Sequence, residues 1–351
     1  MILNATHPAT CIQLVGLDPG TESEILRALE RAGYRNALTL PDASVDLAED
    51  VTAGVVIVGI GPGSNLGTSD VRALAQARAA DARVIAVSTS RSLELRLQAL
   101  AAGASAYLAL PAERPDLLRT VAVVVEVHRA HMELHSLSAF EFGMNGEPRS
   151  EGSTQADIAL ISRVTRLLER IDREVGRHSR RVAKLAAETA AAMGFSESFA
   201  TDVRYAARVH DVGKLVIPRS VMEAPGKLGN TELAIMRTHA MVGATLLRGG
   251  GRLLRLAHEV AATHHEWWDG NGYPAGSSGD AIPIEARIVA VADAFDAMTF
   301  DRSYRAASPA ANALKELRRC AGSQFDPEVV STFLSMRDAA TISMKLRPRA
   351  K

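Results

Sequence analysis

The chain has 351 residues, of which 47% are hydrophobic and 23% are charged, a composition typical of a globular protein with two domains. Lys plus Arg and Asp plus Glu balance at 40 each, which excludes a global electrostatic attraction to nucleic-acid polymers or membrane surfaces. The two cysteines form no metal or redox motif, and no apolar run reaches the ~20 residues that span a bilayer, so we expect a cytoplasmic protein without membrane insertion.

Over about the first 125 residues, β-branched segments alternate with amphipathic segments rich in Ala and Leu, which predicts a parallel α/β sheet. Strands are expected at Cys11–Leu17, Ala37–Leu40, Val55–Ile60, Val84–Ser88 and Ala106–Ala109. Helices are expected at Glu22–Ala32, Thr68–Ala80, Ser92–Ala102 and from Pro115 toward Leu137. We assign residues 8–130 to this α/β domain.

The character of the sequence changes after the last of these helices. Residues 143–153 are rich in Gly, Ser and charge, which predicts a linker, and residues 131–156 form the expected connection of helix and linker. From Asp157 onward, apolar residues recur every three to four positions, as at Val182, Leu185 and Ala186. This spacing predicts an all-α domain over residues 157–340.

Five histidines, two aspartates and one glutamate stand out in the helical half, in separate segments. They are Glu174, His178, His210, Asp211, His239, His264, His265 and Asp293. Each alone is an ordinary helix residue, but imidazole and carboxylate ligands together suit first-row transition metals, and a carboxylate can bridge two ions. Eight candidates exceed the needs of one four-coordinate ion and suit two or three, which would activate a water for in-line displacement at phosphorus.

The stretch HHEWWDGNGYP begins like the His-Glu-x-x-His motif of zinc proteases, but the second histidine would stand at position 269, which is Asp269. A protease site is therefore excluded. We expect the side chains of His264 and His265 to diverge toward different ions, and the glycines of the turn to let the backbone approach a ligand closely. Tyr273 is expected to hold the loop.

The ordered segments HSRRVAKLAAE, HDVGKLVIP, PGKL, IMRTH, HHEWWDGNGYP, ARIVAVADAFDAMTFDRSYR and FDPEVV resemble the HD-GYP domain, a bacterial subgroup of the HD phosphohydrolase superfamily, over roughly residues 160–335. The resemblance implies hydrolysis of the second messenger cyclic di-GMP to pGpG or GMP at two or three divalent ions, often iron or manganese. It implies that the seven His and Asp candidates are metal ligands, with Asp211 bridging, and that Glu174 is the extra ligand of the three-metal type.

The same resemblance implies a set of substrate-binding residues. Lys214 matches a lysine that contacts a substrate phosphate or protonates the leaving oxygen. Gly272 and Tyr273 belong to the GYP signature, and Arg302 and Arg305 match basic residues that hold phosphates, for which the planar guanidinium is suited.

The N-terminal half resembles a response-regulator receiver domain in its (βα)5 rhythm and in the segment GASAYLALP. The resemblance implies an acidic pair where this chain has Gly16 and Leu17. It also implies an Asp nucleophile where the chain has Gly59 and a Lys where it has Leu110. Without these groups aspartyl-phosphate chemistry does not proceed. We therefore expect a pseudo-receiver that serves in dimerisation or partner docking.

Two alternatives to a cyclic di-GMP phosphodiesterase remain open. The helical half is either an enzyme or a catalytically weak sensor or adaptor that docks a GGDEF-domain partner through the GYP loop. An enzyme, in turn, acts on cyclic di-GMP or on another cyclic dinucleotide such as cyclic GMP-AMP. The residues do not distinguish iron from manganese, two ions from three, or pGpG from GMP as product.

Overall fold

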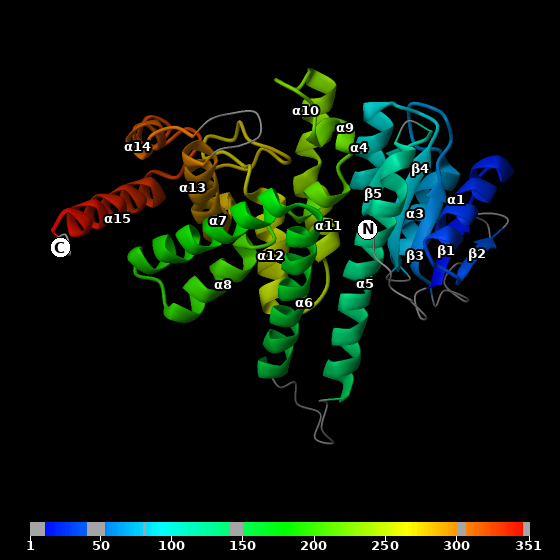
Figure 1. Ribbon diagram of the computed structural model, residues 1–351, viewed down its shortest axis with the longest axis horizontal. Coiled ribbons are helices and arrows are strands. Elements are labelled where there is room, and N and C mark those ends of the chain that lie inside the picture. Colours follow the sequence, from blue (N-terminus) through cyan, green and yellow to red (C-terminus); the bar gives the residue numbers. More distant parts are fainter. Residues whose placement is uncertain are drawn as a thin grey trace, which may run out of the picture. The chain divides into compact units, whose positions relative to one another are not determined.

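The computed structural model describes residues 11–40, 53–79, 82–111, 113–140, 150–300 and 307–346. The chain divides into two compact units (Figure 1). The first comprises Met1–Gly152 and Gly213–Leu246, and the second comprises Ser153–Val212 and Leu247–Lys351. The domain boundaries expected from the sequence, 8–130, 131–156 and 157–340, remain predictions.

A five-stranded parallel sheet with the order β2–β1–β3–β4–β5 lies at the centre of the first unit (Figure 1). Its strands are β1 (Cys11–Val15), β2 (Ala37–Leu40), β3 (Ala53–Gly59), β4 (Arg83–Ser88) and β5 (Ala106–Ala109). Strand β4 is buried along its whole length, as expected of a parallel sheet that is covered on both faces. The order is one of the two common orders of doubly wound sheets. The parallel α/β sheet predicted from the sequence is confirmed.

In the described residues, the strands are accompanied by the helices α1 (Pro19–Arg31), α3 (Thr68–Ala79), α4 (Leu93–Ala101) and α5 (Leu117–Phe140), the last preceded by the 3₁₀ turn η1 (Arg114–Asp116). Helix α1 begins three residues before its predicted start because Asp18 caps it, accepting hydrogen bonds from the backbone N–H groups of Gly20 and Thr21. The first strand ends two residues early, since Gly16 turns the chain with a φ of 66°.

Residues 213–246 add short helices to the first unit. They are η2 (Val212–Val216), α9 (Arg219–Met222), α10 (Asn230–Arg237) and α11 (His239–Leu247). Helix α10 contacts α4. A Cβ atom on Gly213 would lie only 2.0 Å from the carbonyl oxygen of His239, so the backbones of η2 and α11 meet at a point where only glycine fits.

The second unit is helical, as the apolar spacing predicts. Its helices are α6 (Ser150–Ile171), α7 (Arg173–Ala192), α8 (Glu197–Ala207), α12 (Arg252–Thr263), α13 (Ile284–Thr299), α14 (Ala310–Arg319) and α15 (Pro327–Leu346). Helix α7 packs against α8, α13 and α15, and α12 packs against α8 and α13. The packed faces carry buried apolar side chains, such as Val182 and Ala186 of α7 and Val260 of α12.

The predicted linker over residues 143–153 needs one correction, because α6 already begins at Ser150. The single Gly152 costs a helix about 1 kcal/mol relative to Ala, which is too little to stop it. No helix in the described part of the chain combines the length and the apolar character needed to cross a bilayer.

Candidate metal centre

The buried His178 of α7 is held by an ion-pair network between α7 and α13. Its Nδ1 atom lies 2.7 Å from Oδ2 of Asp296, a residue of α13 that is 1% exposed. Arg181, almost one turn further along α7, donates from Nε to Oδ1 of Asp296 at 2.6 Å and from Nη2 to Oδ2 at 2.8 Å. This network orients the imidazole so that Nε2 points away from Asp296, 3.0 Å from Oδ1 of Asp293.

The carboxylates around His178 set its charge. Burial lowers the pKa of His178, but the hydrogen bonds to Asp293 and Asp296 outweigh burial and raise this pKa to about 9. Burial likewise raises the pKa of Asp293, yet the hydrogen bond and charge of His178 hold it well below its usual range. These carboxylates therefore favour the protonated imidazole, and an ion bound at Nε2 would displace the proton from that atom.

Three further histidines share one local arrangement. In each, Nδ1 lies within hydrogen-bond distance of a main-chain carbonyl oxygen of the preceding turn. These contacts join His210 to Ala207 at 2.7 Å, His239 to Met236 at 2.8 Å and His264 to Ala261 at 3.0 Å. A carbonyl oxygen only accepts, so Nδ1 carries the proton and Nε2 of the neutral ring keeps its lone pair. This is the tautomer in which imidazole binds a metal through Nε2.

Asp211 lies among the imidazoles of the second unit, and its two carboxylate oxygens face different histidines. Oδ2 is 3.4 Å from Nε2 of His210 and 3.8 Å from Nε2 of His178, whereas Oδ1 is 3.8 Å from Nε2 of His264. His178, His210 and Asp211 offer ligand atoms that all lie within 4.8 Å of one another, and so do Asp211, His264 and His265. Asp211 belongs to both groups, as a carboxylate between two ions would.

Burial makes this arrangement costly without an ion. His210 is 0% exposed, and its Nε2 atom makes no hydrogen bond within the described residues. A buried polar atom without such a bond costs about 1–3 kcal/mol, which coordination of a metal would offset. The donor set, the buried nitrogen and the fixed tautomers therefore all fit a divalent transition-metal ion.

The remaining predicted site residues belong to other elements or to other parts of the chain. Glu174, in the first turn of α7, is exposed and belongs to neither group of ligand atoms. His239, which is buried, and Lys214, which is half-buried, lie at the start of α11 and in η2, both in the first unit. Arg302 and Arg305 fall in residues 301–306, outside the described residues.

The two adjacent histidines do not diverge, contrary to expectation. The ring centroids of His264 and His265 are 4.1 Å apart with an interplanar angle of 42°. His264 is the C-terminal cap of α12, with helical backbone angles of φ −64° and ψ −9°, and His265 follows it outside the helix. On its other side, the ring of His265 stacks on Tyr273, with centroids 4.8 Å apart, and the backbone N–H of Tyr273 donates to the carbonyl of His265. Tyr273 therefore holds the loop, as predicted.

Gly272 lies close to the chain's own backbone. A Cβ atom at this position would lie 2.2 Å from the backbone nitrogen of Trp267 and 2.5 Å from Cα of Glu266. The close approach is thus between two parts of the chain's own backbone, and a side chain at Gly272 would separate them.

Glu266 holds the same loop and was missed by sequence reasoning. Its side chain is 3% exposed, and its two oxygens accept hydrogen bonds from the backbone N–H groups of Ala275 at 2.7 Å and Ser277 at 3.1 Å. The carboxylate therefore fixes the segment that directly follows Tyr273-Pro274. Asp296 was missed as well, although its spacing of three from Asp293 on one helix face was a readable signal.

Comparison with known proteins matches residues 162–329 to the family described as the HD domain. Among curated proteins, the chain is 43% identical over 176 residues to the "Cyclic di-GMP phosphodiesterase" of Thermotoga maritima, covering 50% of this chain and 48% of the relative. It is 42% identical over 180 residues to the "3'3'-cGAMP-specific phosphodiesterase 2" of Vibrio cholerae, covering 51% and 34% respectively.

A third relative is the "Cyclic di-GMP phosphodiesterase response regulator RpfG" of Xanthomonas campestris, which is 40% identical over 178 residues, covering 50% of this chain and 47% of the relative. The chain therefore spans half or less of the length of these curated relatives.

Proposed function

From the match of residues 162–329 to the HD domain family, we propose that this chain is a metal-dependent phosphodiesterase that hydrolyses cyclic di-GMP to pGpG, GMP or both. The position of Asp211 carries the proposal. One of its carboxylate oxygens faces His178 and His210, and the other faces His264. A shared carboxylate of this kind is typical of sites that hold two adjacent ions for displacement at phosphorus.

We assign the ligands to two ions. His178, His210 and Asp293 with one oxygen of Asp211 would hold the first ion, and His264, His265 and His239 with the other oxygen would hold the second. Adjacent iron or manganese ions would activate a water molecule and neutralise phosphate charge. The exposure of Glu174 favours two ions over three.

The substrate contacts are part of the same proposal. Lys214 would contact a substrate phosphate or donate a proton to the leaving oxygen, Arg302 and Arg305 would bind phosphate oxygens, and the loop with Gly272 and Tyr273 would line the substrate. The stacking of Tyr273 on His265 supports the role of this loop, because it joins the loop to a proposed ligand.

The decisive experiment measures metal content and turnover of cyclic di-GMP on the full chain and on Asp211→Ala. We expect the variant to lose hydrolysis and part of its bound metal. Asp280→Ala is the matched control, because Asp280 is 92% exposed in its side chain and belongs to neither ligand group. A wild-type chain that binds metal fully but does not hydrolyse cyclic di-GMP would refute this proposal in favour of the adaptor.

A second substrate is supported by the comparisons, since the Vibrio cholerae relative described above is named for 3'3'-cGAMP. Both dinucleotides contain guanine and the same 3'–5' phosphodiester linkage, so we propose 3'3'-cGAMP as the alternative substrate. Competition between the two dinucleotides at equal concentration distinguishes these possibilities through the ratio of their kcat/KM values.

We further propose that the N-terminal sheet is a receiver-like domain that has lost phosphorylation. The order of its strands supports this fold. The loss is supported at Gly59, where a Cβ atom would lie 2.3 Å from the carbonyl oxygen of Gly16. A cytoplasmic location, a homodimer and a GGDEF-domain partner at the GYP loop remain proposals.

A further inference from the structure

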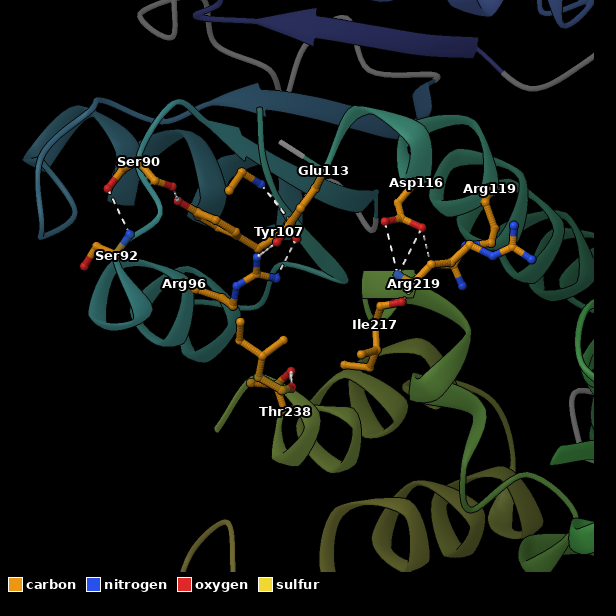
Figure 2. Close-up of polar contacts among 12 residues, drawn as sticks. Ser90, Ser92, Arg96, Tyr107, Glu113, Asp116, Arg119, Ile217, Arg219 and Thr238 are labelled. Carbon is orange, nitrogen blue, oxygen red and sulfur yellow. Dashed lines mark hydrogen bonds and ion pairs between the residues drawn. The ribbon is translucent and has the colours of Figure 1, made fainter. Parts of the chain in front are cut away.

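Two charged residues at the start of α5 bind the backbone of the segment that contains Lys214. They are Asp116, the last residue of η1, and Arg119, in the first turn of α5, and we call this pair the α5 clamp (Figure 2). We propose that the α5 clamp positions Lys214 and that the N-terminal sheet thereby controls turnover. The inference rests on the proposed function, in which Lys214 acts on the substrate.

Arg119 binds the end of η2. Its Nη1 atom donates to the carbonyl oxygen of Leu215 at 2.9 Å, and its Nη2 atom donates to that of Ile217 at 2.7 Å. The carbonyl groups at the end of a helical turn have no partner within the turn, so the guanidinium satisfies two of them at once. Leu215 directly follows Lys214 in η2, and this contact therefore fixes the backbone beside the lysine.

Asp116 binds the start of the next helix. Its carboxylate accepts from the backbone N–H of Arg219 at 3.2 Å, in place of the side-chain cap that Pro218 does not supply to α9. The same carboxylate accepts from Nη2 of Arg119 at 2.7 Å, and Asp116 is only 4% exposed. The two residues thus support each other while holding both ends of the connection between η2 and α9.

The α5 clamp is in turn anchored to the sheet (Figure 2). Glu113 accepts from the backbone N–H of Ala109, the last residue of β5, at 2.9 Å and from Nη2 of Arg96 in α4 at 2.5 Å. Arg96 also donates to the carbonyl oxygen of Tyr107 in β5 at 3.0 Å. These contacts fix the segment between β5 and α5 to the sheet. The α5 clamp, which directly follows this segment, binds residues 215–219.

These contacts have a consequence for function. Charge-assisted hydrogen bonds that are shielded from water are short and strong, so residues 215–219 are expected to follow any displacement of the start of α5. A binding event on the N-terminal sheet would reach Lys214 through these contacts without a phosphorylated aspartate.

The test is a double-mutant cycle in the full chain between Arg119→Met and Lys214→Met, with turnover of labelled cyclic di-GMP as the readout. We expect Arg119→Met to lower kcat by about 10-fold to 100-fold, as misplacement of a reacting group does. In the Lys214→Met background the same substitution should have no further effect, because the group it positions is already gone. A merely structural role would lower kcat by the same factor in both backgrounds.

A second readout does not depend on activity. Amide hydrogen exchange at residues 214–219 should be about 10-fold to 100-fold faster in Arg119→Met than in the wild type. Arg114→Met is the matched control, since Arg114 is exposed in η1 and pairs with Glu24. It should change neither readout.

The outcomes separate the two proposals. If the wild type does not hydrolyse cyclic di-GMP, the proposed function is wrong, and faster exchange in Arg119→Met would still support the α5 clamp. Unchanged exchange, or equal losses of kcat in the two backgrounds, would overturn the positioning role of Arg119. If Lys214→Met hydrolyses as fast as the wild type, no lysine is being positioned and the inference is wrong.

Discussion

The side chain of Asp296 lies 2.7 Å from Nδ1 of His178 and is buried together with it between α7 and α13. The sequence patterns did not single out Asp296 as a site residue. Its carboxylate orients a proposed metal ligand and supplies the charge that Arg181 requires. Mutation of a residue that orients a metal ligand typically lowers metal affinity by about 10-fold to 100-fold.

Replacing Asp296 by Asn should therefore weaken metal binding. The amide has one accepting oxygen in place of two, so it cannot serve His178 and both guanidinium contacts of Arg181 together. We expect the affinity for Mn²⁺ to fall by about 10-fold to 100-fold, measured by calorimetric titration. Asp280→Asn should leave the affinity unchanged. Wild-type affinity in Asp296→Asn would show that the orientation of His178 does not depend on Asp296.

Glu266→Gln should loosen the loop that contains Tyr273. Glutamine presents one acceptor, so the N–H group of either Ala275 or Ser277 loses its buried partner. Such a loss costs about 1–3 kcal/mol of unfolding free energy, to be measured by urea denaturation. The KM for the dinucleotide should rise while metal content stays constant.

Asp269→Asn is the matched control for Glu266→Gln, because Asp269 accepts one bond through Oδ1, from the N–H of Asn271, and Asn keeps that acceptor. Equal effects of the two substitutions would contradict a special role for Glu266.

Gly272→Ala should destabilise the protein although it adds one methyl group. The new Cβ would meet backbone atoms of Glu266 and Trp267, which have little freedom to move away. Overpacking of this kind costs about 1–3 kcal/mol, seen as a lower Tm in calorimetry. Gly61→Ala, where the nearest atom would be 3.9 Å away, should leave Tm nearly unchanged. A stable Gly272→Ala would show that the loop can be displaced at no cost.

Gly59→Asp should not create a phosphorylation site. Its Cβ would lie 2.3 Å from the carbonyl oxygen of Gly16, so the loop after β1 must move before any carboxylate fits. We expect a lower Tm and no added phosphate by mass spectrometry after treatment with acetyl phosphate. Gly61→Asn tests whether a polar side chain is tolerated in the segment that follows β3. Phosphate incorporation by Gly59→Asp would contradict the proposed loss.

Local sequence patterns were sufficient for most of the fold. The five strands are short β-branched segments, and in a parallel sheet buried on both faces such segments have few alternative structures. The start of α1 was misplaced because Asp18 and Pro19 form a cap and a first turn that carry no apolar periodicity. The start of α6 was misplaced for the opposite reason, since polar composition does not by itself end a helix.

The candidate metal ligands could be predicted from the sequence, whereas the residues that orient them could not. Histidine and aspartate are rare enough in a helical half that their clustering indicates a metal centre. Glu266 and Asp296 escaped because their partners, Ser277 and His178, lie eleven and 118 positions away in the sequence. The error at His264 and His265 arises where α12 ends, because His264 is the C-terminal cap of this helix and His265 lies outside it.

The contact between Gly213 and His239 has a mechanical consequence. A Cβ atom on Gly213 would lie 2.0 Å from the carbonyl oxygen of His239 and 2.7 Å from the backbone nitrogen of Gly243, so the backbone of η2 rests directly on α11. Because the two backbones are in direct contact at this point, we expect η2 and the start of α11 to move together. A displacement of η2 would then also displace the first turn of α11. Lys214 and His239, which are 25 positions apart in the sequence, would therefore change position together.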